Sequence, residues 1–316
     1  MCKPKVYIDG KEGTTGLQIY DRLTDRDDIE LLLIDEEKRK DTEERKKLIN
    51  RADIVFLCLP DAAAVQAVEL ADSPDTRIID ASTAHRTAPG WAYGLPELSQ
   101  GHRKLVEVSK RVANPGCHAT GFITAVYPLT AMGIIPSGYP LTAFSLTGYS
   151  GGGKKMIAEY ESPGKPELYG TPRVYGLNLK HKHLPEMQKI CELDSPPVFC
   201  PVVDDYYKGM AVTVMLQNGM LNGKVTAEEI HAALSAHYAG QKMIKVHPFG
   251  YDGMIAAGTM AGFDSLELIV NGHDDQTIIT ALFDNLGKGA SGAAVQNMNL
   301  MLGFEEIRGL NLKQPD

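Results

Sequence analysis

One cysteine of this chain stands in a setting that favours nucleophilic chemistry. Cys117 follows Asn114-Pro115-Gly116 and precedes a helix-like run over 122–132. Proline and glycine make a sharp turn, which would present the thiol at or just before a helix N-terminus. There the helix dipole lowers the pKa of a thiol, and N–H groups of the turn can hold an oxyanion. The sequence predicts that Cys117 is the nucleophile of a covalent mechanism.

The other four cysteines lack this setting. Cys58 lies in an apolar strand-like run, where a free cysteine usually only packs. Cys191 and Cys200 have no comparable turn nearby, and Cys2 lies at the N-terminus. Five cysteines without a Cys-x-x-Cys pair do not make a secreted disulfide framework. We expect free thiols in a reducing compartment.

Two further segments carry groups that suit such a reaction. Residues 147–155 are rich in glycine, hydroxyl and ammonium groups and can grip a small anion, although a loop without a ligand is an equal alternative. His181 and His183 suit acid–base work near neutral pH. Two histidines in this spacing can also bind a metal, but no further ligand lies at a zinc spacing. No metal site is predicted.

A glycine-rich turn after the first apolar run is typical of nucleotide binding. Gly10, Gly13 and Gly16 stand where a strand would lead into a helix, with hydroxyls from Thr14 and Thr15 beside them. Glycine lets the backbone approach a pyrophosphate, and the helix N-terminus favours its charge. The spacing is looser than the usual dinucleotide motif, so a tight turn without a ligand is the alternative.

The end of the second predicted strand bears on the type of nicotinamide cofactor. An acidic residue there would hold the 2′-hydroxyl of NAD, whereas basic residues accommodate the 2′-phosphate of NADP. The acidic run 35–37 is followed at once by Lys38, Arg39 and Lys40. The basic residues favour NADP(H), and use of both cofactors stays open.

These groups need a framework, and the hydrophobic pattern predicts an α/β one. Apolar runs alternate with helix-like segments in the order β-α-β-α-β-α-β, which indicates a Rossmann-like doubly wound parallel sheet. Strands are expected at 6–8, 30–34, 54–59 and 77–79, with helices near 15–24, 41–51 and 61–72. Extended runs at 141–147, 198–203, 210–216 and 266–270 then predict an α+β domain with a mostly antiparallel sheet. The apolar spacing over 284–302 predicts one helix that returns to the first domain.

Composition limits the classes of partner. The chain has 316 residues, 43% of them hydrophobic and 23% charged, which is ordinary for a globular protein with a substantial core. A net charge of −8 without a basic stripe argues against nucleic-acid binding. The chain shows no signal-peptide stretch and no run of membrane-spanning length. We expect a cytoplasmic protein with a small-molecule substrate.

Six segments together resemble one known family. They are 9–16, 80–86 with 93–97, 114–121, 148–154, 181–186 and 289–298. In order and spacing they are similar to N-acetyl-γ-glutamyl-phosphate reductase in its short, type 2 form. The resemblance implies an NADP-binding Rossmann domain over 1–116, completed by a C-terminal helix at about 285–316. It also implies a catalytic and dimerisation domain over 117–284, and a homodimer or homotetramer.

The resemblance also implies a reaction and its residues. Cys117 would attack the acyl phosphate of N-acetylglutamate, phosphate would leave, and NADPH would reduce the thioester to the semialdehyde in arginine biosynthesis. His181, six residues after Tyr175, would be the acid–base group, with His183 as the fallback. Arg86, Asn114, Ser150 and Gly151 would hold the substrate's phosphate and carboxylate, and Ser82 and Asn297 would border the nicotinamide. His118 departs from the tyrosine expected beside the nucleophile.

Two alternatives stay open. A sister enzyme would act on N-acetyl-α-aminoadipyl phosphate or aspartyl phosphate, because one methylene gives only about 1–3 kcal/mol of discrimination. A non-catalytic nucleotide sensor would keep the fold without the chemistry. A sensor would not need Cys117 in its turn together with His181.

Overall fold

The chain forms two compact units. The computed structural model describes residues 3–314, so Cys2 lies outside the described residues. One unit comprises residues up to 115 together with 290–310, and the other comprises 116–289 together with the residues from 311 onward. The sequence-based division places 311–314 with the first domain, whereas the structure places them with the second unit. The reason is a pair of hydrogen bonds, because Asp264 N–H donates to Asn311 O and Asn311 N–H donates to the Asp264 carboxylate.

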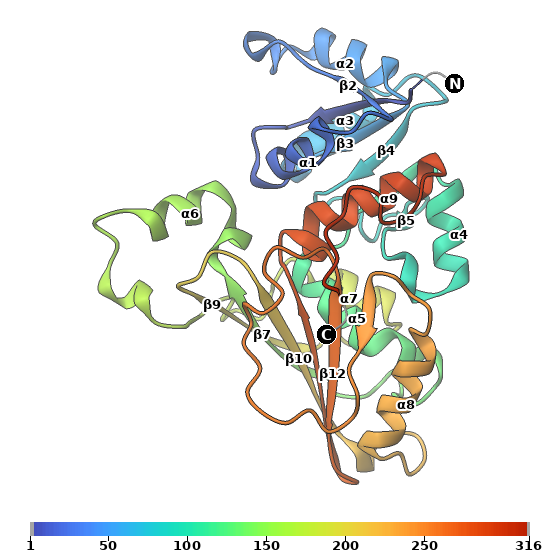
Figure 1. The fold of residues 1–316 in the computed structure, drawn as a ribbon, viewed down its shortest axis with the longest axis vertical. Coiled ribbons are helices and arrows are strands. Elements are labelled where there is room, and N and C mark those ends of the chain that lie inside the picture. The colour runs from blue at the N-terminus through green and yellow to red at the C-terminus, as the bar shows by residue number, and fades with distance from the viewer. Residues whose placement is uncertain (1–2, 315–316) are drawn as a thin grey trace. The chain divides into compact units, whose positions relative to one another are not determined.

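A six-stranded parallel sheet organises the first unit (Figure 1). The strand order is β2-β1-β3-β4-β6-β5, and every pair is parallel. The predicted doubly wound α/β sheet is thereby confirmed. In chain order the elements are β1 (Lys5–Asp9), α1 (Thr14–Thr24), β2 (Glu30–Leu32), α2 (Thr42–Arg51), β3 (Ile54–Leu57), α3 (Asp61–Glu69), β4 (Arg77–Asp80), β5 (Ala92–Tyr93), α4 (Gln100–Val108), β6 (Arg111–Ala113) and α9 (Gly292–Leu302).

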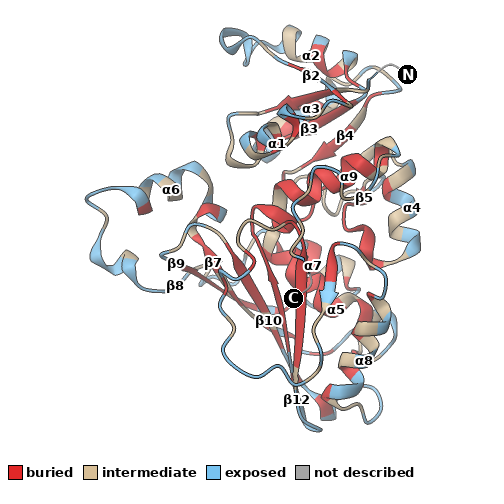
Figure 2. Ribbon diagram, in the orientation of Figure 1, coloured by how far each residue is buried: buried red, intermediate tan, exposed pale blue. Residues whose placement is uncertain are grey.

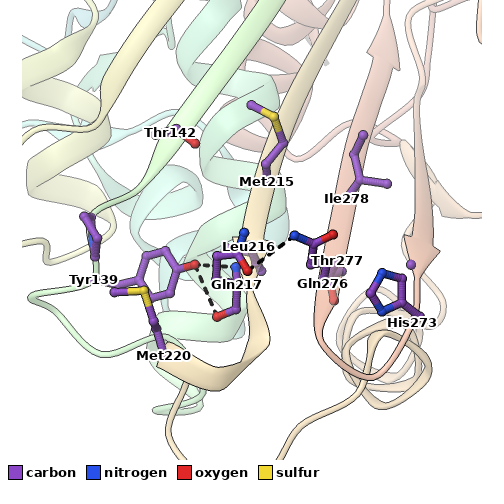
Figure 3. Close-up of a pocket in the computed structure, with 12 residues that line it drawn as sticks. Tyr139, Thr142, Met215, Leu216, Gln217, Met220, His273, Gln276, Thr277 and Ile278 are labelled. Atoms are coloured by element: carbon purple, nitrogen blue, oxygen red, sulfur yellow. Dashed lines mark hydrogen bonds between the residues drawn. The ribbon is translucent and has the colours of Figure 1, made fainter.

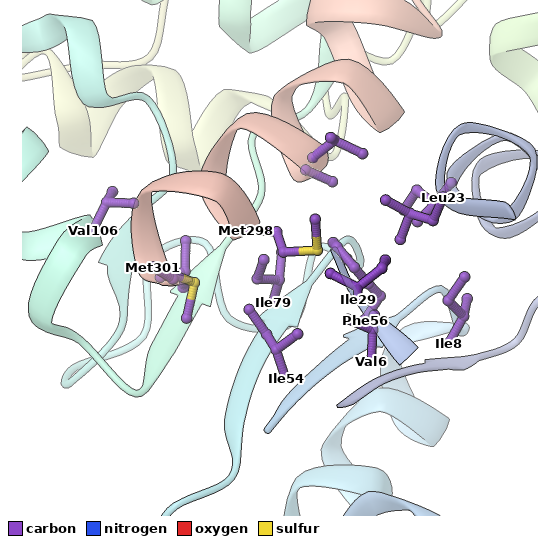
Figure 4. Packing of buried hydrophobic residues seen from close by; sticks show 14 of the residues in the cluster. Val6, Ile8, Leu23, Ile29, Ile54, Phe56, Ile79, Val106, Met298 and Met301 are labelled. Atoms are coloured by element: carbon purple, nitrogen blue, oxygen red, sulfur yellow. The ribbon is translucent and has the colours of Figure 1, made fainter. Parts of the chain in front are cut away.

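Helix α9 supplies part of the core of this first unit. Met298 and Met301 pack in one apolar cluster with Ile54, Phe56 and Ile79 from the sheet (Figure 4). The predicted helix over 284–302 is correct for α9 but wrong for its first residues, because 287–291 form a π-helical turn. There the Gly289 N–H reaches back five residues to Asp284 O. Two glycines in this stretch weaken the regular helix.

The second unit is built on a seven-stranded mixed sheet, mostly antiparallel as predicted. Its strand order is β11-β12-β13-β10-β7-β9-β8, in which only β11–β12 and β7–β9 pair in parallel. In chain order the elements are α5 (Cys117–Ala131), β7 (Thr142–Gly148), α6 (Gly153–Glu161), β8 (Arg173–Val174), α7 (Leu184–Ile190), β9 (Val198–Asp204), β10 (Met210–Gln217), α8 (Ala227–His237), β11 (Ile244–Val246), β12 (Leu266–Gly272) and β13 (Gln276–Phe283).

Helices cover one face of this second sheet. Helix α5 packs on β10 and β13, and α8 packs on β12. Figure 2 shows most of the strands and α5 as buried, whereas α6 is mainly a mixture of exposed and intermediate residues. Across the described part of the chain, no helix combines the length and the apolar character needed to cross a bilayer.

Close packing fixes the position of α5. A Cβ atom built on Gly121 would lie 2.7 Å from side-chain atoms of Val212 on β10 and 2.8 Å from Phe283 on β13. Real Cβ atoms do not approach other atoms so closely, so the helix can lie at this distance from the sheet only with glycine here. Cys117, one turn earlier, is positioned by the same contact.

We expect Gly121→Ala to destabilise the protein although alanine is the better helix former. Overpacking costs about 1–3 kcal/mol, whereas helix propensity returns at most about 1 kcal/mol. Differential scanning calorimetry should show a lower Tm. Gly101→Ala in α4 is the matched control, because its Cβ would meet only Ser99 Oγ at 3.5 Å. A control that is as destabilised as Gly121→Ala would contradict this account of the packing.

Candidate active site

The glycine-rich turn of the first unit has a backbone that only glycine can form. Gly10 has φ +87°, and a Cβ on it would lie 2.4 Å from Cys58 O. A Cβ on Gly16 would lie equally close to Gly10 O. Gly13 is the N-cap of α1, where no side chain caps the helix and no acidic residue stands in its first turn. The first N–H groups of a helix have no intrahelical partner, so this end suits a phosphate group.

The buried acidic residue that directly precedes this turn is neutralised, whereas Glu12, inside the turn, is exposed. Asp9, buried at the end of β1, receives Arg45 from α2, with Nη2 at 2.8 Å and Nε at 3.2 Å from its carboxylate. The bond to Asp9 raises the pKa of Arg45. The ion pair removes a charge that would otherwise repel an anion at the glycine turn.

Two buried polar atoms of the first unit fit a dinucleotide. Within residues 3–314, Thr14 Oγ1 and Asn297 Oδ1 are buried without a hydrogen-bond partner. The other side of the Asn297 amide donates to Gly94 O at 2.9 Å and to Asn114 Oδ1 at 3.2 Å, which fixes its orientation. A buried polar atom without a partner is costly, and a bound nucleotide would offer both atoms a partner. Thr15 lies half-buried in the first turn of α1.

The acidic and basic residues after β2 form a 3-10 turn over Glu36–Lys38. The Asp35 carboxylate caps this turn by accepting from Glu37 N–H at 3.1 Å. Arg39 is exposed and pairs with Glu36 at 2.9 Å, and Lys38 is exposed. An exposed ion pair of this kind contributes about 0–1 kcal/mol, so Arg39 can exchange it for a ligand.

The loop after β4 uses its polar side chains to hold its own shape. Buried Asp80 accepts from the N–H and the hydroxyl of Ser82 and contacts His85 Nδ1 at 2.6 Å. Arg86 donates to the carbonyl oxygens of Asn114 and Ala81 at 3.0 and 3.2 Å. Ser82 and Arg86 were predicted as ligand-binding residues, and both therefore also make contacts that hold the structure of this loop.

In the second unit, Cys117 is the first residue of α5, as its sequence context predicts. Gly116 is the N-cap, no side chain caps the helix, and no acidic residue stands in its first turn. The buried carboxylate of Glu186 accepts from Gly116 N–H at 3.1 Å. A Cβ on Gly289 would lie 2.9 Å from Cys117 Cβ. The backbone of Gly289 thus packs closely against the Cβ of Cys117, and the thiol is half-buried.

An aromatic cluster lies around the residue that follows the thiol. His118, His181 and His183 lie with ring centroids 4.7–5.6 Å apart. His181 Nδ1 accepts from His183 N–H at 3.2 Å, so the proton of a neutral His181 is on Nε2. His181 is half-buried, whereas His183 is buried as the N-cap of α7.

Tyr175 joins this cluster and stays protonated. Its hydroxyl lies 2.7 Å from His118 Nε2. Burial, and secondly the charge of Cys117, raise the pKa of Tyr175. The phenol therefore keeps its proton and can donate a hydrogen bond.

The predicted residues lie in both units. In the first, Asn114 and Asn297 share one hydrogen-bonded network. In the second, Cys117, His181 and His183 belong to neighbouring elements, and Ser150 is buried where Asn285 Nδ2 donates to it at 2.9 Å. Gly151 follows in the same 3-10 turn, Tyr149–Gly152.

Three residues that shape these sites were not predicted from the sequence: Arg45, Glu186 and Asn285. Each acts on a partner at least 36 residues away in sequence. Only Glu186 carried a local signal, as an acidic residue beside the histidine pair. Among residues 3–314, no three histidine, cysteine or acidic residues group as metal ligands.

Known protein families match both units. The NAD-binding domain of semialdehyde dehydrogenase matches residues 22–106, and the dimerisation domain of semialdehyde dehydrogenase matches 117–285. Two structures of aspartate semialdehyde dehydrogenase II from Vibrio cholerae share the fold, with a TM-score of 0.73 at 16% and 18% identity. Each alignment covers 96% of this chain and 99% of that chain. Fold and site define a dehydrogenase of the semialdehyde dehydrogenase type.

Curated relatives narrow this class. N-acetyl-γ-glutamyl-phosphate reductase 2 from Nostoc is 47% identical, and that from Pseudomonas putida is 46% identical, each over 98% of this chain and 100% of the relative. The reductase from Brucella ovis is 47% identical over 95% and 99%. The chain belongs to the N-acetyl-γ-glutamyl-phosphate reductase family, which confirms the resemblance found in its sequence.

Proposed function

We propose that this chain reduces N-acetyl-γ-glutamyl phosphate to N-acetylglutamate semialdehyde with NADPH in arginine biosynthesis, and that Cys117 is the nucleophile. The observation that carries the proposal is Cys117 at the uncapped N-terminus of α5, in the unit that also holds His181 and Tyr175. Cys58 and Cys191 are poor candidates. Burial raises the pKa of Cys58 and of Cys191, which suppresses their thiolates.

The reaction follows from these groups. The Cys117 thiolate attacks the acyl carbon, a C–S bond forms, and the bond to the phosphate oxygen breaks with release of phosphate. NADPH, when bound, would supply the hydride that reduces the thioester carbon. The resulting oxyanion re-forms its C=O bond as the C–S bond breaks, which releases the aldehyde and restores the thiolate. The one proton that the overall reduction consumes is taken up by the released phosphate. N–H groups in the first turn of α5 stabilise negative charge on oxygen in both steps.

His181 is the better acid–base residue of the two candidates. Its half-buried ring carries a proton on Nε2 when neutral, and its other nitrogen is held by the His183 backbone. His183 is buried, and its backbone starts α7. We assign His181 the proton transfer and His183 the positioning of His181.

Lys38 and Arg39 support the choice of NADP(H). The Asp35 carboxylate, which would hold a ribose hydroxyl in an NAD enzyme, is engaged with its own backbone. Arg39 offers a planar fork to a 2′-phosphate, which Arg binds bidentately. Thr14 and Asn297, with the three glycines of the turn, complete the proposed cofactor site, and Ser82 acts through the shape of its loop.

A second copy of the chain is the proposed partner. The face of the second sheet opposite α5 exposes Met215 and Ile278, which lie opposite each other on β10 and β13. They line an apolar hollow of about 600 Å³ with Tyr139 and Met220 (Figure 3). Exposed apolar patches of this kind mark association sites, and a two-fold axis would pair this face with itself. We propose a homodimer, with a homotetramer as its further assembly.

Cys117→Ser should abolish turnover while NADPH still binds. The reverse reaction, with N-acetylglutamate semialdehyde, phosphate and NADP⁺, is followed by absorbance of the reduced nicotinamide. The native chain should require phosphate, and the variant should lose at least about 10³-fold in kcat. Turnover that persists in Cys117→Ser would exclude the thioester route. If the native chain prefers a longer or shorter semialdehyde, the thioester route still holds, but the substrate assignment is wrong.

Arg39→Ala should weaken NADPH binding and leave NADH binding unchanged. Loss of one charged hydrogen-bonded contact costs about 1.5–3 kcal/mol, or roughly 10–100-fold in Kd. Isothermal titration calorimetry measures both ligands. Arg51→Ala, at the exposed end of α2, removes the same charge and is the control. Equal losses for NADPH in both variants would show a general field effect and not a phosphate contact.

Met215→Glu should convert the dimer to a monomer, because two carboxylates would face an apolar surface without partners. Light scattering coupled to size exclusion measures the mass. Met132→Glu introduces the same charge at the end of α5, where Met132 is 47% exposed, and should leave the dimer intact. A native chain that is monomeric at micromolar concentration would refute the proposed interface.

A further inference from the structure

The residue directly after the nucleophile has no role in the mechanism so far. His118 is 3% exposed, and both of its ring nitrogens have hydrogen-bond partners. Nδ1 lies 2.8 Å from Ser145 Oγ on β7, and Nε2 lies 2.7 Å from Tyr175 Oη. Phe199 packs edge-on against the ring, with centroids 5.2 Å apart. The imidazole therefore bridges a buried hydroxyl and the phenol of Tyr175, whose pKa the charge of Cys117 helps to raise.

This imidazole is neutral throughout the working range of pH. Burial, followed by the nearby charges of His181 and Lys182, lowers the pKa of His118 to about 3. His183 and Tyr175 also face the ring. A neutral imidazole has one donor and one acceptor nitrogen, so the bridge has two possible directions.

The negative charge on Cys117 selects one direction. If Tyr175 donated its proton to Nε2, only oxygen lone pairs would remain for a thiolate or an oxyanion, and these repel negative charge. If Nε2 donates to Tyr175 Oη, the phenol proton is available to the anion. Ser145 is compatible with this arrangement, because a hydroxyl can donate to Nδ1.

We propose that His118 is a positioning residue for the reduction: its Nε2–H donates to Tyr175 Oη and thereby directs the Tyr175 O–H toward the sulfur of Cys117 and the oxyanion that forms on it. The proposal rests on the proposed function, because it assigns a donor to the thiolate named there. Ser145, His118 and Tyr175 then form one chain of hydrogen bonds that ends at the nucleophile. Tyr175 is the group that touches the reacting atoms, and His118 acts through it.

The test compares variants that keep the shape of the ring with a variant that keeps its donor. His118→Phe and Tyr175→Phe each remove hydrogen bonding and keep an aromatic ring. His118→Gln can place an amide N–H near the position of Nε2. Thr124→Val is the matched control, because it removes another buried hydroxyl of α5, which donates to Thr120 O at 2.7 Å.

Two readouts separate positioning from general damage. Alkylation of Cys117 by iodoacetamide is followed against pH by mass spectrometry of the peptide that contains it, and kcat and KM are measured for the same proteins. In both Phe variants we expect half-maximal alkylation at a higher pH than in the native chain and a kcat lower by about 10–100-fold, the range for a hydrogen bond to a charged group. KM should stay nearly constant. His118→Gln should recover most of both properties, and Thr124→Val should match the native chain.

The double variant decides whether His118 acts through Tyr175. His118→Phe combined with Tyr175→Phe should be no worse than Tyr175→Phe alone, because the second change removes an interaction already lost. Additive losses would overturn the proposal, and so would an unchanged alkylation profile in His118→Phe. If Cys117→Ser abolishes turnover in the same series, additive losses or an unchanged alkylation profile would refute only the role of His118. If Cys117→Ser remains active, the proposed function itself fails.

Discussion

The turn that precedes the nucleophile is held on both sides, and the geometry of the thiol depends on it. Asn114 donates its N–H to Asp80 O at 2.8 Å, and its own carbonyl receives Arg86. Pro115 has no N–H to satisfy. Gly116 donates to Glu186, and its carbonyl receives both the N–H and the hydroxyl of Thr120. Because both the N–H and the carbonyl of Gly116 are fixed, the start of α5 has little freedom, and the thiol is preorganised before any substrate arrives.

The chain handles anions by local arrangement and not by net charge. At −8 overall, it would repel a phosphorylated substrate and a dinucleotide at long range. Both α1 and α5 begin with glycine N-caps and lack acidic residues in their first turns. Asp9, beside the first of these helix ends, is paired with Arg45. Each of these two helix N-termini therefore offers its N–H groups and its dipole to an anion, although the protein carries a net negative charge.

Local patterns predicted the features that depend on neighbouring residues. The glycine turn, the cysteine turn and the alternation of strands and helices up to β4 follow from short-range sterics and hydrophobic period. Central strand β13 was not predicted, because pairing with β10 and β12 defines it more than its own apolar content does. The bonds Asp9–Arg45 and Gly116–Glu186 span 36 and 70 residues, and sequence spacing does not specify them. The roles of Cys117, His181, Lys38 and Arg39 stay predictions, because the structure gives their setting and not their chemistry.

Glycine at both helix N-caps has a consequence for how this protein can evolve. Serine or aspartate at an N-cap stabilises a helix by a few tenths of a kcal/mol over glycine. Glycine at positions 13 and 116 therefore makes α1 and α5 slightly less stable than a capping residue would. Substitution by a capping residue would fill the N–H groups that the ligands need. A lineage selected for heat resistance therefore has to gain stability elsewhere, in cores, loops or surface charges. These two positions mark where thermostability and turnover compete directly.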